Sequence, residues 1–161
     1  MLFLNPDSLK IKRAAKLHKE KLMDLIFERF DKLKDFSSIR FFENLVANDL
    51  EEILIGKPDT LIILSENVNV FLENNETLRA SIEYIFNYRW FIYKTDDRYS
   101  GYSLATALDI KTCVYCNRNY TSTVVTQRGD KITRPQFDHY FEKKGHPLLA
   151  LSFFNLIPSC S

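Results

Sequence analysis

The sequence is poor in cysteine and contains no long apolar segment. It has three cysteines in 161 residues, and an odd number with two at C-x-x-C spacing does not fit a secreted disulfide framework. Apolar runs such as residues 61–64 are far too short to span a bilayer, and the N-terminal residues contain no signal-peptide core. We therefore expect a soluble, cytoplasmic protein without a membrane partner.

The sequence also lacks a strong net charge, which is +1, so total charge says nothing about partners. The distribution is uneven, because residues 43–83 carry two Lys/Arg against nine Asp/Glu and residues 111–146 carry seven against three. The second stretch holds cysteines and histidines, and local positive charge is typical of a phosphate-binding surface. Ordinary surface charge explains it equally well.

Glycine is scarce at 4 residues, whereas hydrophobic residues make up 45% of the chain. This composition excludes a disordered chain. Apolar residues at helical spacing predict four helices, over residues 8–34, 37–55, 59–73 and 76–94. Asp7 or Ser8 is the predicted N-cap of the first helix, and Gly56 ends the second. His18 lies among lysines, so we expect a solvated surface side chain.

A polar stretch at residues 96–101 is the predicted boundary between two regions. Residues 1–98 form a helical region that docks a partner or substrate, and residues 99–161 carry the chemistry. Just before the boundary, aromatic residues concentrate in residues 84–93 with basic residues between them. Such a stretch can stack nucleobases, but a helix that packs into the core is the preferred interpretation.

The second region begins with strand signals. Residues 120–127 are rich in Thr, Val and Tyr and predict a strand. Residues 128–130, Arg-Gly-Asp, are interpreted as a hairpin turn rather than an adhesion motif, and a return strand begins at Lys131. Pro147 opens an apolar segment that predicts a three-turn helix with Pro at its first position. The expected fold class is α+β, mainly α.

The cysteines indicate a structural zinc site. Cys113 and Cys116 are two residues apart, a spacing that lets both thiolates reach one tetrahedral zinc ion, and Cys160 can be a third ligand. A redox site is the rival interpretation. A thioredoxin-like motif needs a strand before it and a helix after it, whereas a strand-turn-strand is predicted after this C-x-x-C. Incidental cysteines are the remaining alternative.

Asp138 and His139 are the candidate catalytic pair. Phosphodiester hydrolysis needs a base for water and a cation for the developing charge. Neutral imidazole suits the base role, and a carboxylate suits Mg²⁺ or Mn²⁺. Asn155 could hold the loop that presents His139, although a helix C-cap is the preferred local interpretation. His146 is expected to be a surface turn residue, with phosphate contact as the alternative.

Three cations close to this pair are predicted to contact a nucleic-acid backbone. They are Arg134, Lys143 and Lys144. Long cationic side chains orient a polyanion through its phosphates.

Three segments together resemble the HNH endonuclease family of the ββα-metal, or His-Me finger, type. They are C-V-Y-C-N-R-N-Y, R-P-Q-F-D-H-Y-F-E-K and H-P-L-L-A-L-S-F-F-N-L-I-P-S-C. The similarity is to zinc-knuckle HNH proteins, some of which belong to Septu-type anti-phage defence systems with a partner ATPase. It covers residues 111–161, and residues 140–143 depart from it mildly, where the family often has a Pro before its Lys.

The resemblance implies a role for each matching residue. Asp138 would bind the catalytic Mg²⁺ or Mn²⁺, His139 would be the general base, and Asn155 would hold the His-bearing loop. Cys113, Cys116 and Cys160 would bind structural Zn²⁺. The family pattern continues with another Cys and a metal-binding Asn beyond residue 161, so we expect an HNH domain that is incomplete at its C-terminus and a fragment that is inactive or severely impaired.

Two functions follow as hypotheses. The first is a metal-dependent HNH endonuclease that hydrolyses DNA in bacterial defence, with a partner ATPase. The second is a non-catalytic, zinc-stapled module that binds nucleic acid or a partner protein. A helical interaction protein with incidental Cys and His residues is a weaker third.

Overall fold

The computed structural model describes residues 4–93 and 98–160, which are mainly helical with a small β part. This confirms the α+β, mainly α expectation. In chain order the elements are α1 (Leu9–Phe30), α2 (Phe36–Asn48), α3 (Leu50–Ile55), α4 (Pro58–Leu72), α5 (Glu76–Ile85), α6 (Tyr88–Tyr93), α7 (Gly101–Leu108), β1 (Val124–Val125), β2 (Lys131–Thr133), β3 (Gln136–His139), the 3₁₀ turns η1 (Pro147–Leu149) and η2 (Phe153–Asn155), and β4 (Leu156–Ser159). No described helix is long and apolar enough to cross a bilayer.

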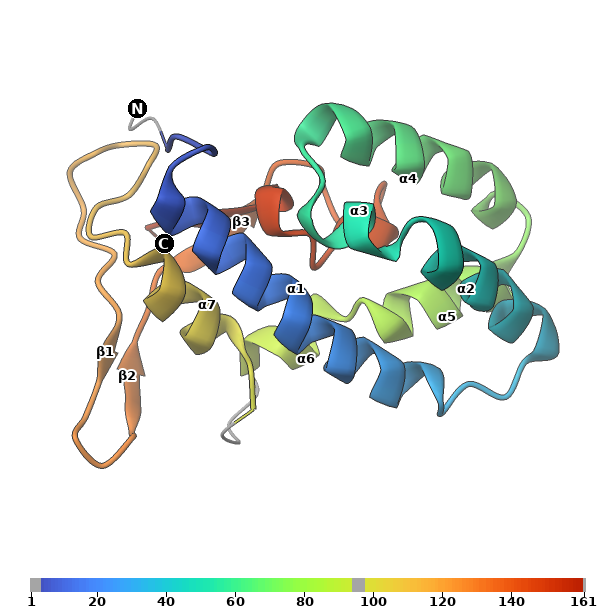
Figure 1. The fold of residues 1–161 in the computed structure, drawn as a ribbon, viewed down its shortest axis with the longest axis horizontal. Helices are drawn as coiled ribbons and strands as arrows, with labels where there is room; N and C mark the ends of the chain where they lie inside the picture. The colour runs from blue at the N-terminus through green and yellow to red at the C-terminus, as the bar shows by residue number, and fades with distance from the viewer. Residues whose placement is uncertain (1–3, 94–97, 161) are drawn as a thin grey trace.

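Helix α1 is the longest element and crosses the molecule, as Figure 1 shows. Its N-cap is Ser8, whose hydroxyl oxygen accepts from the Ile11 N–H, as predicted. An apolar stripe along α1 is buried, including Leu22, Leu25 and Ile26. This stripe packs against α3, α5 and α7.

Two of the four predicted helices are interrupted. The helix predicted over residues 37–55 is two helices, α2 and α3, and the Asp35 side chain caps the first by accepting from the Ser38 N–H. The helix predicted over residues 76–94 stops at Ile85. The Asn87 side chain accepts from the Trp90 N–H, a local bond that begins a new helix instead of continuing the old one.

Aromatic residues of this stretch mainly pack into the protein. Phe86 and Phe91 are buried, and the Arg29 guanidinium lies over the rings of Tyr84 and Trp90. The packing interpretation is therefore confirmed for these residues. The predicted boundary at residues 96–101 lies partly outside the described part, which omits residues 94–97.

His18 is buried with 0% exposure, so the prediction of a solvated side chain is wrong. Its Nε2 donates to the Leu151 carbonyl at 2.7 Å, and its Nδ1 accepts from the Tyr99 hydroxyl at 3.0 Å. His18 lies one helical turn from Ala15 and from Leu22, on the buried stripe of α1. Its position on that stripe, rather than its lysine neighbours, decided its environment.

The C-terminal segment differs from the sequence-based expectation. The three-turn helix predicted from Pro147 is wrong, because the chain forms two 3₁₀ turns and then β4. Ser152 and Asn155 are buried there and bond to backbone groups, Ser152 to the Ile53 carbonyl and Asn155 to the Leu149 carbonyl. Such side-chain bonds compete with helical hydrogen bonding.

The β part consists of two antiparallel pairs in the described residues. Strands β1 and β2 form the predicted hairpin, shorter than expected, with Gly129 at φ 91° in its turn. Strands β3 and β4 pair in register, Asp138 opposite Ile157 and His139 opposite Leu156. One hydrophobic core extends from Ile11 to Leu156, so it includes residues from both sequence-defined regions.

We expect protonation of His18 to oppose folding. Burial lowers its pKa from 6.5 to about 4, so between these pH values the unfolded chain binds more protons. The contribution of neutral, buried His18 to the free energy of unfolding is therefore complete above about pH 6.5. It is lost as the pH falls to about 4, a difference of about 3 kcal/mol.

Urea denaturation at pH 7, 5.5 and 4 measures this effect against a His18→Gln variant. The wild type should lose more unfolding free energy than the variant over this pH range. Equal losses in both proteins would contradict the assignment.

Candidate functional site

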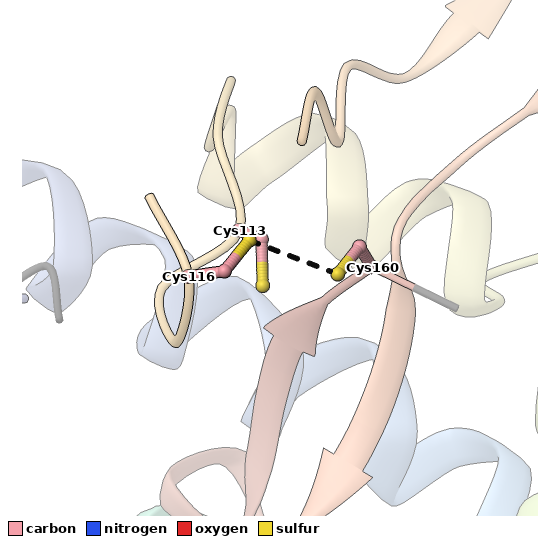
Figure 2. Close-up of side chains that lie close together, drawn as sticks. All are labelled: Cys113, Cys116 and Cys160. Carbon is pink, nitrogen blue, oxygen red and sulfur yellow. Dashed lines mark hydrogen bonds between the residues drawn. The ribbon is translucent and has the colours of Figure 1, made fainter. Parts of the chain in front are cut away.

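The three cysteines lie together at one end of the β part, as Figure 2 shows. Their sulfur atoms are all within 4.8 Å of one another, and the Cys116 and Cys160 sulfurs are 3.9 Å apart. Sulfur ligands of a tetrahedral zinc ion with 2.3 Å bonds lie about 3.8 Å apart. The cluster therefore has the donor atoms and the spacing to hold a metal such as zinc.

The local backbone prepares Cys113 as a metal ligand. The Cys113 N–H donates to the Asn119 carbonyl, the Asn117 N–H donates to the Cys113 carbonyl, and Asn117 takes a positive φ of 50°. This turn aims N–H groups at the sulfur. Backbone donors from Cys116, then Cys160, lower the pKa of Cys113 to about 6, which favours the thiolate that binds metal.

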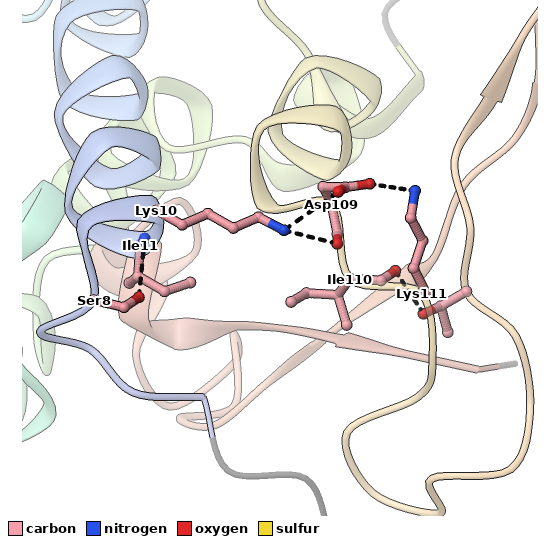
Figure 3. Close-up of polar contacts among 7 residues, drawn as sticks. Ser8, Lys10, Ile11, Asp109, Ile110 and Lys111 are labelled. Carbon is pink, nitrogen blue, oxygen red and sulfur yellow. Dashed lines mark hydrogen bonds and ion pairs between the residues drawn. The ribbon is translucent and has the colours of Figure 1, made fainter.

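The cysteine loop is attached to the helical part through Asp109, which ends α7 in the left-handed conformation. Figure 3 shows the Lys10 ammonium of α1 beside Asp109. It donates to the Asp109 backbone carbonyl at 3.0 Å and lies 3.4 Å from the Asp109 carboxylate, which also pairs with Lys111. The Thr121 hydroxyl donates to the Ile110 carbonyl. The Lys10 contact connects the start of the loop to α1, and the Thr121 bond closes the end of the loop onto its start.

We expect the purified protein to bind about one zinc ion, and each of Cys113→Ser, Cys116→Ser and Cys160→Ser to lose most of it. A hydroxyl is a much poorer zinc ligand than a thiolate. Metal analysis after gel filtration measures the stoichiometry, with His146→Gln as a control that should keep the metal. Zinc-free wild-type protein would contradict this expectation and favour incidental cysteines.

Asp138 is exposed at the surface of β3. One carboxylate oxygen accepts from the Tyr115 hydroxyl at 2.9 Å, and the other accepts from the His139 N–H at 2.9 Å. Tyr115 lies between the two cysteines of the C-x-x-C motif, so it connects the sulfur cluster to the carboxylate. Burial, then the bond to Asp138, raises the pKa of Tyr115 to about 12, which keeps the hydroxyl a donor.

His139 is half-buried and held by the chain that follows it. Its Nε2 lies 3.0 Å from the Ala150 carbonyl; because a carbonyl only accepts, Nε2 carries the proton. The neutral ring therefore has its lone pair on Nδ1. Burial lowers the pKa of His139, so the neutral form dominates at pH 7.

Asn155 holds the backbone that follows His139. The Asn155 side chain is fully buried, accepts from the Phe141 N–H at 2.6 Å, and donates to the Leu149 and Phe141 carbonyls at 2.8 and 3.2 Å. The Asn155 carbonyl also accepts from the Tyr140 N–H. Its side chain thus has the geometry of a loop holder, rather than that of a helix cap.

An open depression of about 680 Å³ contains Asp138 and His139. Residues 142–144, 147 and 150 line it together with residues of α5, of α6 and of the link between these helices. Its described charged lining is balanced, with three cations and three carboxylates: Arg89, Lys143, Lys144, Glu83, Asp138 and Glu142. A phosphate would therefore meet little net attraction there without a bound cation.

Two candidate residues lie outside this depression. The Arg134 guanidinium lies 5.5 Å from the Tyr102 ring centre and donates to the Pro135 carbonyl, and it lines a separate hollow near Cys160. His146 bonds to the Ser65 hydroxyl at 2.9 Å and packs against Phe141. His146 therefore connects the loop to α4 instead of lying free in a surface turn.

We expect Asn155→Leu to lower the free energy of unfolding by about 3 kcal/mol. The substitution removes the side-chain partner of the Phe141 N–H and of the Phe141 carbonyl, at roughly 1–3 kcal/mol each, whereas the Leu149 carbonyl keeps its bond from the Ser152 N–H. Asn67→Leu on the exposed face of α4 is the control and should change stability by less than about 0.5 kcal/mol. Denaturation and hydrogen exchange of the Phe141 N–H measure both effects; equal stability of the two variants would exclude the loop-holding role.

Two residues at the site were not found from the sequence. Tyr115 is an ordinary member of the C-x-x-C loop, and Tyr88 lies in a stretch interpreted as core. No local pattern marks a hydroxyl that reaches a residue 23 positions away, as Tyr115 reaches Asp138, or 49 positions away, as Tyr88 reaches Phe137. Pairing of β3 with β4 brings these parts together.

Comparisons with protein-family models, with curated proteins and with solved structures give no match. A function for this chain therefore has to be argued from the arrangement of its side chains.

Proposed function

We propose that this chain carries the catalytic pair, Asp138 and His139, of a metal-dependent endonuclease of the HNH type that hydrolyses DNA phosphodiester bonds. The observation that carries the proposal is the Nε2 bond of His139 to the Ala150 carbonyl. This bond leaves Nδ1 as the acceptor of the ring, and His139 lines a depression together with Asp138, Lys143 and Lys144. Its setting in bacterial defence beside an ATPase rests on the sequence resemblance alone.

His139 is the proposed general base. A base must be unprotonated at working pH and within reach of water. Burial lowers the pKa of His139, and its contact with the depression gives a substrate water access to the ring. The Ala150 carbonyl would stabilise the imidazolium that forms when Nδ1 takes the proton of water.

Asp138 is the proposed ligand of a divalent cation. Mg²⁺ keeps several waters and is often held by one or two carboxylates together with substrate phosphate, so one exposed carboxylate fits it. Among the described residues the only cluster of three potential ligands is the cysteine group. A bound Mg²⁺ or Mn²⁺ would stabilise the developing charge on the phosphate.

Lys143 and Lys144 are the proposed phosphate contacts, since both line the depression. The three carboxylates in the same lining offset their charge. Binding of DNA in this depression should therefore depend on the divalent cation more strongly than on the lysines alone.

The assay uses the native gene product, which is the protein encoded by the complete natural gene. We expect His139→Ala to reduce its cleavage of plasmid DNA at least about 100-fold, because general-base catalysis contributes ~10²–10⁴-fold. The assay follows nicking with Mg²⁺ or Mn²⁺ and with EDTA. Asn67→Leu on the exposed face of α4 is the control and should cleave at the wild-type rate. DNA binding by His139→Ala, measured by fluorescence anisotropy, should remain.

The second candidate is a zinc-stapled binding module without catalysis. The cysteine cluster favours it, because three potential ligands lie within 4.8 Å of one another there, and no such cluster among the described residues includes Asp138. It predicts bound zinc, no metal-dependent nicking and no effect of His139→Ala. Metal-dependent nicking that His139→Ala abolishes would exclude it.

A further inference from the structure

Tyr88 connects the helical region to the candidate catalytic strand. It is the first residue of α6, and its hydroxyl donates to the Phe137 carbonyl on β3 at 3.0 Å. Its ring meets the His139 imidazole edge-on, with ring centres 4.5 Å apart and planes at 80°. The Lys143 ammonium lies 4.5 Å from the centre of the same ring. One side chain thus contacts the strand, the candidate base and a candidate phosphate ligand.

The placement of Tyr88 follows from the break between α5 and α6. Phe86 and Phe91 are buried on either side of it, and Asn87 begins α6 through its bond to the Trp90 N–H. These neighbours fix the backbone from which Tyr88 reaches β3. Burial raises the pKa of Tyr88, so its hydroxyl remains a donor at neutral pH.

The His139 ring is joined to the chain at its Cβ atom and is held at Nε2 by the Ala150 carbonyl. Rotation about the Cβ–Cγ bond can still tilt the plane of the ring within that hydrogen bond. An edge-to-face aromatic contact has a preferred geometry, and the Tyr88 ring supplies it. Together the two contacts determine where Nδ1 points.

We propose that Tyr88 is a positioning residue for His139, so that α6 forms a functional wall of the site and not only part of the core. The inference rests on the proposed function for its consequence in catalysis. Its geometric part is independent of any activity. The cation–π contact adds a second role, because it holds the Lys143 ammonium above the ring at the edge of the depression.

The imidazole resonances test the geometric part directly. The chain has three histidines, so His139 can be followed by long-range ¹H–¹⁵N spectra at pH 8, with His18 and His146 as reporters of intact folding. The wild type should show the Nε2–H tautomer of His139 and a nuclear Overhauser effect between its ring protons and those of Tyr88. Absence of that effect in the wild type would overturn the proposal without any variant.

Three variants complete the test. Tyr88→Leu should shift or broaden the His139 resonances while those of His18 stay in place, and Tyr88→Phe, which keeps the ring, should preserve the Nε2–H tautomer. Tyr93→Leu changes an exposed tyrosine of the same helix, 71% exposed, and should leave His139 unchanged. Unchanged His139 resonances in a folded Tyr88→Leu variant would contradict the proposal.

Cleavage assays of the native gene product address the catalytic consequence. Tyr88→Leu should lower kcat by about 100-fold, the effect of a misplaced catalytic group, with a smaller loss in Tyr88→Phe and none in Tyr93→Leu. If Tyr88→Leu disturbs His139 but the wild type cleaves no DNA, the proposed function fails and the positioning role stands. If the wild type cleaves DNA and Tyr88→Leu matches it, the role of Tyr88 in catalysis is excluded.

Discussion

The structure depends on how one buried, irregular segment satisfies its backbone hydrogen bonds. Residues 147–155 pass through the core without forming an α-helix. The carbonyls of Pro147, Leu149 and Ser152 accept from N–H groups of the same segment. Those of Ala150 and Leu151 are bonded by side chains instead, His139 to Ala150 and His18 to Leu151, and a buried carbonyl without a partner is costly. The Asn155 side chain adds a second donor to the Leu149 carbonyl.

This constraint joins the fold to the candidate site. The bond that satisfies the Ala150 carbonyl also sets the tautomer of His139, and the bonds that hold Asn155 also fix the loop after that histidine. Strand β4 continues from this segment to Cys160. A metal at the cysteines would therefore stabilise the strand opposite Asp138 and His139, and Tyr115 extends the same connection to the carboxylate.

The sequence predicted the features that depend on local chemistry. The cap at Ser8, the hairpin turn at Gly129 and the approach of Cys113 to Cys116 follow from short-range spacing, and each is present. Cys160 joins the two other cysteines from 44 positions along the chain. The prediction of an exposed His18 was wrong because it was based on the neighbouring lysines and not on the position of His18 on the apolar stripe of α1. The helix predicted from Pro147 failed because Ser152 and Asn155 bond to distant backbone, which no local periodicity shows.

Long-range features of the site had no sequence signal. The contact of Tyr88 with His139 depends on the break at Asn87 and on the pairing of β3 with β4. The sequence left two alternatives for Asn155, a side chain that holds the His139 loop and a helix C-cap. The burial of the Asn155 side chain favours the first. Residue type therefore indicated the candidate chemistry, whereas tertiary packing determined which groups meet.

A crystal structure of the native gene product with bound Mn²⁺ tests the central claim most directly, because anomalous scattering distinguishes manganese from zinc. We predict manganese at the Asp138 carboxylate, zinc among the three sulfur atoms, and His139 Nδ1 directed into the depression with Nε2 bonded to Ala150. A Mn²⁺-soaked crystal without manganese at Asp138, or with Nδ1 bonded to the protein interior, would contradict the account.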